Sequence, residues 1–347
     1  MSNLSKIEHL ASLQLSRPSA TARVGKAVLA VLPWAIIAGL LCAGLFIRPQ
    51  PIGGTVTPAA LERRDHFYGL ALTPGGDVWV SGSYGKILSI ASDGAIEKLT
   101  TPTELTLQDI AIWDVNHAVA VGNDGVILYS QNAGESWTVA AGVPRSEVAN
   151  KLNRVRIAPG GLAIATGEMG ALLISRDYGQ NWQRLREEED VAWNDVAILE
   201  DGRLVVVGEF GQVLIGDLEG QLWTDVEPPV PDSLMSVQFR DAQNGVAVGL
   251  EGAVLVTQDG GYSWEGVDLG MTDHLFDVLW VEQQGCWFVS GALGRWASGG
   301  EKGWKTGVLD ERSRAWHTSA LVVESDIWLA GADIGRWDGG RWFELQP

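Results

Sequence analysis

The sequence predicts an all-β fold, a seven-bladed β-propeller preceded by one N-terminal transmembrane helix. Two observations support this prediction: a glycine pair that recurs seven times, and one uncharged apolar run before the repeats. The first glycines of the pairs are Gly82, Gly122, Gly167, Gly208, Gly249, Gly291 and Gly331, so the period lies between 40 and 45 residues. A period in the forties, filled with short strands, is typical of propeller blades.

Each repeat contains signals for four strands. An alternating innermost strand, such as residues 109–112, is followed by a small, β-branched strand that ends at the first glycine of the pair. An apolar third strand and a short outer strand complete the unit. We expect the two glycines to permit positive φ and to let neighbouring blades pack closely. Because every repeat has its own four strands, no strand exchange between the first and last blades is evident, and the alternative is an exchanged strand supplied by residues 52–62.

The apolar run covers residues 27–47 and contains no charged residue. A helix of this length spans roughly 30 Å, which matches the hydrocarbon core of a bilayer. The alternative is a cleaved signal peptide, but its apolar region is usually only about 7–15 residues long. The predicted organisation is therefore a tail over 1–23, an anchor over 24–47, a proline- and glycine-rich linker over 48–64 and the propeller over 65–347.

The distribution of cations predicts the orientation of the anchor. Lys6, Arg17, Arg23 and Lys26 precede the apolar run, whereas Arg48 alone follows it directly. The positive-inside rule then places the N-terminus in the cytoplasm and the propeller outside it, in the periplasm if the cell is Gram-negative. The expected location is thus the cytoplasmic (inner) membrane, crossed once.

The net charge of −18 is concentrated after the anchor. Such a surface repels phosphate backbones, so we expect no nucleic-acid partner. Five arginines of the third repeat are interpreted as exposed strand and turn residues that balance the acidic run at 187–190. They are Arg154, Arg156, Arg176, Arg184 and Arg186.

A polar turn of the form SxDxGxxW precedes the outer strand in several repeats. Residues 175–182 match it in full, and residues 130–137 and 257–264 match it with one conservative change each. We expect the Asp or Asn side chain to accept backbone N–H groups, the glycine to be left-handed and the tryptophan to bury. The residues in question are Asn132, Trp137, Ser175, Asp177, Gly179, Trp182, Asp259, Gly261 and Trp264.

These turns resemble the Asp-box, or bacterial neuraminidase repeat, of sialidases and other propellers. In that family the box is a folding element away from the catalytic face. The resemblance implies no catalysis here, because the Arg-Ile-Pro motif of sialidases is interrupted in this chain, at residues 156–159, and lies in the third repeat. We therefore expect no catalytic residue and no enzyme activity, with a glycan-binding or glycoside-hydrolysing propeller as an alternative.

The repeats with their box turns and VxxGxxGxIxxS pattern resemble the photosystem II stability and assembly factor family over residues 65–345. That family consists of seven-bladed propellers, and the resemblance implies a non-enzymatic scaffold that holds an integral membrane protein or envelope complex during assembly. The photosynthetic members present a basic patch to their client, whereas this propeller is acidic. The alternative that the resemblance leaves open is an accessory subunit of an envelope transporter, such as an RND-type exporter.

Propeller topology predicts a partner-binding face. The turns between second and third strands and the segments that enter the innermost strands share one side of the ring, where exposed apolar tips suit a partner. The predicted face comprises Tyr68, Tyr84, Met169, Trp193, Phe210, Leu250, Phe276, Leu293, Trp316 and His317. In the alternative interpretation, Trp193 and Trp316 cover the ends of inner strands. The histidines lack metal-ligand spacing, so no metal and no cofactor is expected.

Overall fold

The computed structural model describes residues 20–46, 59–227 and 229–346. The chain divides into two compact units, Met1–Pro58 and Ala59–Pro347. In the first, helix α1 (Ala20–Phe46) contains Val28–Leu45, a stretch with a mean hydropathy of 2.4 and no buried residue. This helix is long and apolar enough to cross a membrane. Most of the predicted tail over 1–23 and of the predicted linker over 48–64 lies outside the described residues.

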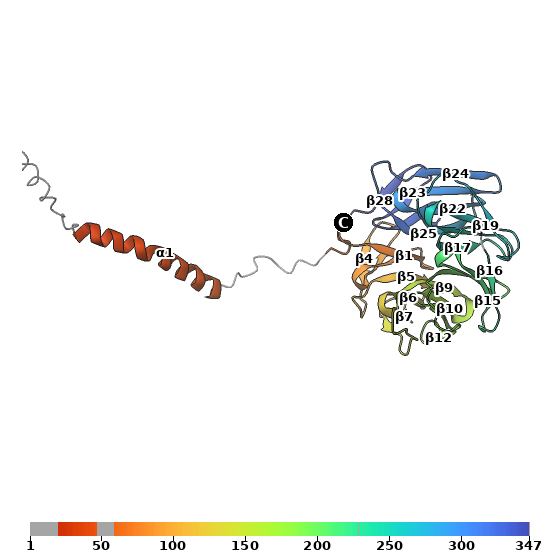
Figure 1. The fold of residues 1–347 in the computed structure, drawn as a ribbon, viewed down its shortest axis with the longest axis horizontal. Coiled ribbons are helices and arrows are strands. Elements are labelled where there is room, and N and C mark those ends of the chain that lie inside the picture. Colours follow the sequence, from red (N-terminus) through yellow and green to blue (C-terminus); the bar gives the residue numbers. More distant parts are fainter. Residues whose placement is uncertain (1–19, 47–58, 228, 347) are drawn as a thin grey trace, which may run out of the picture. The chain divides into compact units, whose positions relative to one another are not determined.

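The second unit contains seven sheets of four antiparallel strands each (Figure 1). Blades 1 to 3 are β1 (Phe67–Leu72), β2 (Val78–Gly82), β3 (Ile87–Ile90), β4 (Ile96–Leu99); β5 (Leu107–Ile112), β6 (Ala118–Gly122), β7 (Ile127–Ser130), β8 (Thr138–Val139); and β9 (Leu152–Ala158), β10 (Leu162–Gly167), β11 (Leu172–Ser175), β12 (Gln183–Arg184). Blades 4 and 5 are β13 (Trp193–Ile198), β14 (Arg203–Gly208), β15 (Val213–Asp217), β16 (Trp223–Val226); and β17 (Leu234–Phe239), β18 (Gly245–Gly249), β19 (Val254–Thr257), β20 (Glu265–Gly266). Blades 6 and 7 are β21 (Leu275–Val281), β22 (Cys286–Gly291), β23 (Arg295–Gly300), β24 (Gly303–Val308); and β25 (His317–Val323), β26 (Asp326–Gly331), β27 (Ile334–Trp337), β28 (Trp342–Glu344).

The sheets follow one another around a ring, and the colours in Figure 1 run from orange through green to blue in that order. Each innermost strand contacts the next, and β1 contacts β25, so the ring is closed. Every sheet uses four consecutive strands, which confirms the predicted seven-bladed propeller without strand exchange. At the closure, Ala60 and Leu61 pack with Ala330 and Ile334 of blade 7.

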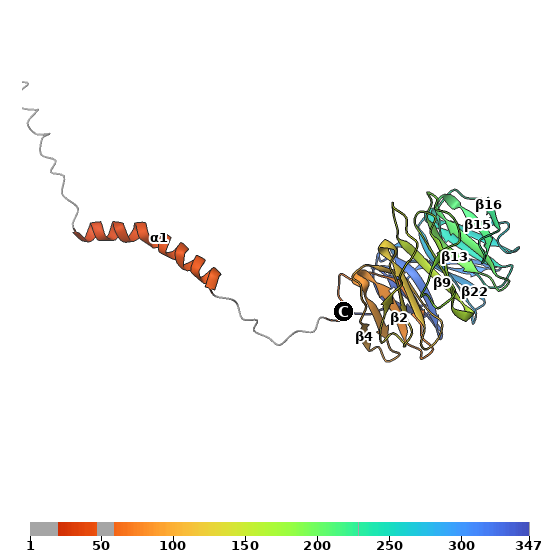
Figure 2. The same cartoon turned by 90° about the horizontal axis from the view of Figure 1, so that it is seen from below.

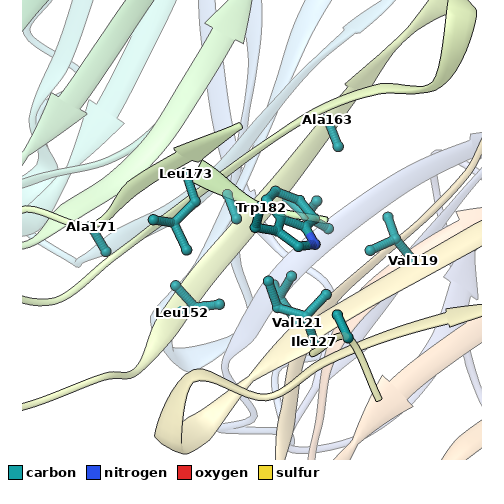
Figure 3. Close-up of a cluster of buried hydrophobic side chains, with 11 residues drawn as sticks. Val119, Val121, Ile127, Leu152, Ala163, Ala171, Leu173 and Trp182 are labelled. Atoms are coloured by element: carbon teal, nitrogen blue, oxygen red, sulfur yellow. The ribbon is translucent and has the colours of Figure 1, made fainter. Parts of the chain in front are cut away.

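Figure 2 shows the same blades from a second direction. Apolar side chains from facing sheets hold neighbouring blades together. Trp182 of blade 3 illustrates the contact, because it lies among Val119, Val121 and Ile127 of blade 2 as well as Leu173 of its own blade (Figure 3). Trp137 and Trp264 join equivalent clusters of blades 1 and 2 and of blades 4 and 5. The box tryptophan is thus a wedge between blades as well as a cover of its own hairpin.

The box turns have the predicted hydrogen bonds. In blade 3, Asp177 Oδ1 accepts the backbone N–H groups of Gln180 and Asn181, at 3.1 and 3.0 Å, and the Trp182 indole donates to the Gly179 carbonyl at 2.8 Å. Although burial disfavours the ionised form, these hydrogen bonds, with those from Asn181 and Ser175, lower the pKa of Asp177. The glycine is left-handed, with φ of +82° at Gly179.

In the first six pairs the two glycines have different roles, which corrects the prediction that both take positive φ between blades; in the seventh pair neither Gly331 nor Gly335 has positive φ. The first is extended, with φ of −157° at Gly208. A Cβ there would lie 2.5 Å from the Ala192 carbonyl oxygen, so this glycine lets two strands of the same blade approach closely. The second, Gly211, has φ of +71°, and a Cβ there would lie 2.3 Å from the Val230 oxygen in the connection to the next blade. Only the second glycine therefore fits the prediction.

Carboxylates in the central channel tie alternate blades to their neighbours. Asp109, Asp195 and Asp277, at the third position of strands β5, β13 and β21, are buried. Each accepts a backbone N–H from the next blade: Val155 for Asp109 at 2.9 Å, Val237 for Asp195 at 3.1 Å and Ala320 for Asp277 at 2.7 Å. These carboxylates thus link neighbouring blades and provide acceptors for backbone N–H groups that are buried in the channel wall.

Two arginines of β9, Arg154 and Arg156, lie among these three carboxylates. We call the five side chains together the charged layer. Arg154 reaches across the channel to the Thr318 carbonyl at 2.7 Å and to Asp277 Oδ1 at 3.2 Å. Arg156 binds Asp195 through two nitrogens, at 2.8 and 2.6 Å. Arg154 is buried, which corrects the expectation that the arginines of the third repeat are exposed. The reason is pairing: a buried guanidinium is stable where carboxylates and carbonyls surround it.

The pKa directions follow from this geometry. Burial disfavours the charged form of Asp195, but the Arg156 guanidinium outweighs it and lowers the pKa of that carboxyl. Asp109 has no arginine in direct contact, and its burial raises the pKa of its carboxyl. Of these two carboxyls, Asp195 is therefore the more firmly ionised.

Replacing Trp182 with alanine should destabilise the propeller strongly. The side chain is 4% exposed, and truncating a buried tryptophan costs about 3–5 kcal/mol. We expect a lower thermal midpoint for the full-length protein in mild detergent, followed by near-ultraviolet circular dichroism. Trp223→Ala is the matched control: this tryptophan ends the equivalent turn of blade 4, residues 216–223, a weaker match to the box pattern, and because it is only partly buried its loss should cost less. Equal shifts would contradict the wedge role.

Replacing Asp195 with alanine should cost about 3 kcal/mol, because it leaves the partly buried Arg156 and the Val237 N–H without their acceptor. Asp201→Ala, which removes an exposed partner of Arg203, should cost at most about 1 kcal/mol. Since the native pKa of Asp195 lies below its ordinary 3.8, the stabilisation is present above pH 3.8 and is lost as the pH falls through the native value. Thermal midpoints of the Asp195→Ala variant and the wild type should therefore converge in acid; a gap that widens would refute this account.

Candidate functional site

The turns between second and third strands lie on the same side of the ring as the segments that enter the innermost strands. In each blade the first residue of the turn donates its backbone N–H to the residue before the innermost strand, as Ser83 does to His66 and Glu209 to Ala192. We call this side the turn face. The box turns lie on the opposite side, where they bond the hairpins between first and second strands, as Tyr178 N–H does to the Gly161 carbonyl.

Six turns present a non-glycine residue in the left-handed conformation at their tip. These residues are Tyr84, Asp124, Met169, Phe210, Glu251 and Leu293, with φ between 53° and 58°. This conformation costs about 1–2 kcal/mol for an L-residue with a Cβ. Tyr84 is 63% exposed, Phe210 71% and Leu293 41%, so burial of these side chains in the propeller is incomplete and offsets only part of that cost.

A ring of seven side chains surrounds the mouth of the channel on the turn face. Each is the second residue of an innermost strand, where the pairing with the next strand shifts by one residue, so this residue has no cross-strand partner. Such a bulge redirects a side chain. The ring consists of Tyr68, Gln108, Asn153, Asn194, Met235, Phe276 and Thr318.

The ring encloses a cavity of about 260 Å³ with the buried Arg154 among its lining residues. Its wall is apolar at Tyr68, Met235 and Phe276 and amide-rich at Asn153 and Asn194, which lie 3.3 Å apart through Nδ2 and Oδ1. On the far side of the charged layer, a second cavity of about 540 Å³ contains Arg156. The charged layer therefore closes the mouth cavity from below.

An aromatic cluster extends the mouth outward. Tyr68 stacks on Trp316 with ring centroids 5.6 Å apart, and the His66 ring lies at the same distance from Trp316 in a tilted arrangement. Partial burial raises the pKa of the Tyr68 phenol despite a hydrogen bond with Ser83, so Tyr68 is neutral at physiological pH. The cluster offers a partly exposed aromatic surface beside a polar cavity.

Eight of the ten residues predicted for the binding face lie on it with some exposure, and two do not. Tyr84, Phe210 and Leu293 are exposed tips; Tyr68, Met169, Leu250, Phe276 and Trp316 are partly buried. Trp193 and His317 are each only 1% exposed, so neither offers a surface to a partner.

Their burial has a simple cause. Trp193 and His317 occupy the first position of their strands, which is filled by leucine or phenylalanine in the other five blades and packs under the first glycine. A Cβ at Gly208 would lie 2.7 Å from the Trp193 ring, which shows how tight this contact is. The imidazole of His317 contacts Asp333 Oδ1 through Nε2 at 2.7 Å.

Five members of the mouth ring were not predicted: Gln108, Asn153, Asn194, Met235 and Thr318. The signal for them was the repeat alignment itself, because each follows the buried first residue of its strand. Among the residues that the structure describes, no group of three His, Cys, Asp or Glu side chains has the geometry of a metal site.

Comparison with known proteins bears on the fold and on the family. The family model described as "Photosynthesis system II assembly factor YCF48" matches residues 88–203, and no curated protein matches the sequence. Solved structures of similar fold include YCF48 bound to a D1 peptide, with 15% identity, a TM-score of 0.63 and coverage of 77% of this chain and 90% of that one. YCF48 from Cyanidioschyzon merolae has 14% identity, a TM-score of 0.63 and coverage of 78% and 94%.

A third similar structure is PorZ, a surface component of the type-IX secretion system of Porphyromonas gingivalis. It has 17% identity and a TM-score of 0.62, and the match covers 81% of this chain but 38% of PorZ. These identities show a shared fold. The family model, together with that fold, confirms the predicted resemblance of this chain to the photosystem II assembly-factor propellers of the YCF48 family.

Proposed function

We propose that this protein is a membrane-anchored, non-enzymatic scaffold that binds a segment of another membrane protein on its turn face and supports its assembly or stability. The observation that carries the proposal is the set of exposed apolar tips held in the left-handed conformation. Residues kept in costly backbone conformations without a packing role concentrate at functional sites.

The arrangement of the tips suits a partner larger than a small ligand. Tyr84, Met169, Phe210 and Leu293 come from blades 1, 3, 4 and 6, so they lie at separate points around the mouth cavity. A protein segment that crosses the mouth can contact several tips and place one side chain in the cavity. Aromatic and large apolar residues in such positions supply most of the binding energy in protein interfaces.

The relatives support the same kind of partner. A solved YCF48 structure contains a D1 peptide, so a propeller of this fold accommodates a segment of another protein. Helix α1 places this propeller at a membrane in our proposal, with the N-terminus in the cytoplasm and the propeller outside. The client is then an integral membrane protein or envelope complex, and the accessory subunit of an envelope transporter is one form of the same role.

Replacing the three exposed tips with glycine tests the face. In a Tyr84→Gly, Phe210→Gly, Leu293→Gly variant the side chains are lost, while glycine accepts the left-handed backbone without strain. We expect the thermal midpoint to stay constant or rise. Recovery of the membrane client from native membranes in mild detergent, measured by quantitative mass spectrometry, should fall at least about tenfold, because losing an interface anchor costs about 2 kcal/mol or more.

The matched control is Leu222→Gly, which removes a leucine that is 72% exposed in the box turn of blade 4, on the opposite side of the ring. It should leave client recovery unchanged. If the folded tip variant recovers the same integral membrane proteins as the wild type, the turn face is not the binding site.

The anchor makes a separate prediction. The full-length chain, with α1 retained, should stay in the membrane pellet after an alkaline carbonate wash, and protease added to spheroplasts should digest the propeller. Intact-mass measurement checks retention of the helix. A mature protein that lacks α1 and washes off the membrane would support the signal-peptide alternative instead.

A further inference from the structure

The box side of the propeller contains a groove that is filled between blades 2 and 3. Tyr178, in the box turn of blade 3, packs on the hairpin between β5 and β6 of blade 2. Its ring stacks on His117 with centroids 4.0 Å apart and meets the edge of Trp113 at 5.4 Å. Trp113 in turn donates its indole N–H to the Ala158 and Leu162 carbonyls of blade 3, at 3.1 and 3.0 Å. Three aromatic side chains therefore close this groove.

The equivalent groove between blades 4 and 5 is filled in another way. There the box residue is Gly260, and the residue equivalent to His117 is Arg203, since Leu199 N–H bonds the Arg203 carbonyl as Trp113 N–H bonds that of His117. Arg203 donates to the Gly260 carbonyl at 3.0 Å and to the Ala242 carbonyl at 2.8 Å. Its long side chain takes the place of the missing tyrosine ring.

Between blades 1 and 2 the same three positions hold small residues. Ala133 stands in place of Tyr178, and Thr73 and Asp77 stand in place of Trp113 and His117, as the Thr73 N–H bond to the Asp77 carbonyl shows. All three line an open cavity of about 290 Å³. Ala133 has φ of 57° and Tyr178 has φ of 61°, so both residues take the same left-handed conformation at this position while their side chains differ.

The walls of this cavity define its chemistry. Trp79, Leu99 and Ile112 form an apolar floor, and Trp79 is 6% exposed. Asp77, Glu97 and Asp114 supply carboxylates, and no lysine or arginine lies among the described residues that line it. Slight burial works against the charge of Asp114, but hydrogen bonds from His117 and from two backbone N–H groups lower the pKa of Asp114, so it is ionised at neutral pH.

We propose that this groove binds an aromatic side chain of a protein partner, presented in an exposed segment next to lysine or arginine. The ring takes the place that Tyr178 fills in the next groove, and the adjacent cation faces the three carboxylates. Burial of a ring beside apolar walls drives binding, and the carboxylates select the flanking charge. This site lies on the side of the ring opposite the turn face, so this proposal can be tested independently of the proposed function.

Short peptides test the proposal on the full-length protein in neutral detergent. The probe contains Lys-Trp-Lys with a 5-fluorotryptophan, and its binding is measured by ¹⁹F line broadening against empty micelles. A Glu-Trp-Glu peptide with the same ring tests the charge, and unlabelled Lys-Ala-Lys, used as competitor, tests the need for the ring. We expect Lys-Trp-Lys to bind at least about fivefold more tightly than Glu-Trp-Glu at low salt, and Lys-Ala-Lys not to displace it.

Two variants fill the groove from within. Ala133→Tyr and Thr73→Trp each introduce the residue found at the equivalent position of the filled groove, and each should reduce Lys-Trp-Lys binding at least about fivefold. Ala133→Tyr should not lower the thermal midpoint, whereas Thr73→Trp also removes the hydroxyl that accepts the Asp77 N–H at 3.0 Å and should lower it slightly. Gln131→Tyr is the matched control, because it adds the same ring at an exposed position of the same turn and should bind the probe as wild type does.

The proposal is overturned if wild type does not distinguish Lys-Trp-Lys from Glu-Trp-Glu, or if Lys-Ala-Lys displaces the probe equally well. It is also overturned if a folded Ala133→Tyr or Thr73→Trp variant binds like wild type. Should one of these variants not fold, the other variant and the comparison of peptides on wild type still decide.

Discussion

The propeller depends on the covering of each blade by its neighbours. A four-stranded sheet with short outer strands has two apolar faces, and neither is stable in water alone. Every cluster of buried side chains in the ring draws on adjacent blades, and the cluster at the closure does so through Leu61, which precedes the first strand. The fold therefore depends most on the buried apolar residues between blades.

Polar groups in the channel are also satisfied by neighbouring blades. Inner strands converge there, and their backbone N–H groups face other blades rather than water. Asp109, Asp195 and Asp277 accept these donors, and Arg154 and Arg156 balance the buried charge. A charged layer of this kind adds little net stability compared with an apolar one, but it is costly to break. It also divides the channel, so that the mouth on the turn face is a cavity that is open to the outside and has Arg154 at its base.

Repetition made the fold predictable from the sequence, and departures from regular pairing made part of the site unpredictable. The glycine period, the box turns and the apolar helix are local patterns, and they predicted seven blades, the turn hydrogen bonds and a helix long enough for a membrane. Trp193 and His317 were placed on the surface wrongly because a bulge follows them. One inserted residue changes which side chain points to the mouth, and alternation of polar and apolar residues does not reveal it. The Arg154 contact with Asp277 joins residues 123 positions apart, which no local pattern indicates.

The repeat also separates what supports the fold from what is free for binding. Seven near-equivalent blades act as internal controls, since a position that the fold requires has the same kind of residue in nearly every blade. The first glycines and the first inner-strand residues meet that test. The tips do not, because tyrosine, aspartate, methionine, phenylalanine, glutamate and leucine share one left-handed backbone. The residue before the box glycine also varies: it is Ala133 in blade 2, Tyr178 in blade 3 and Gly260 in blade 5, all with positive φ. Variation at a fixed backbone conformation shows that folding does not select the side chain at these positions, so the exposed apolar tips are free to serve the partner binding that we propose.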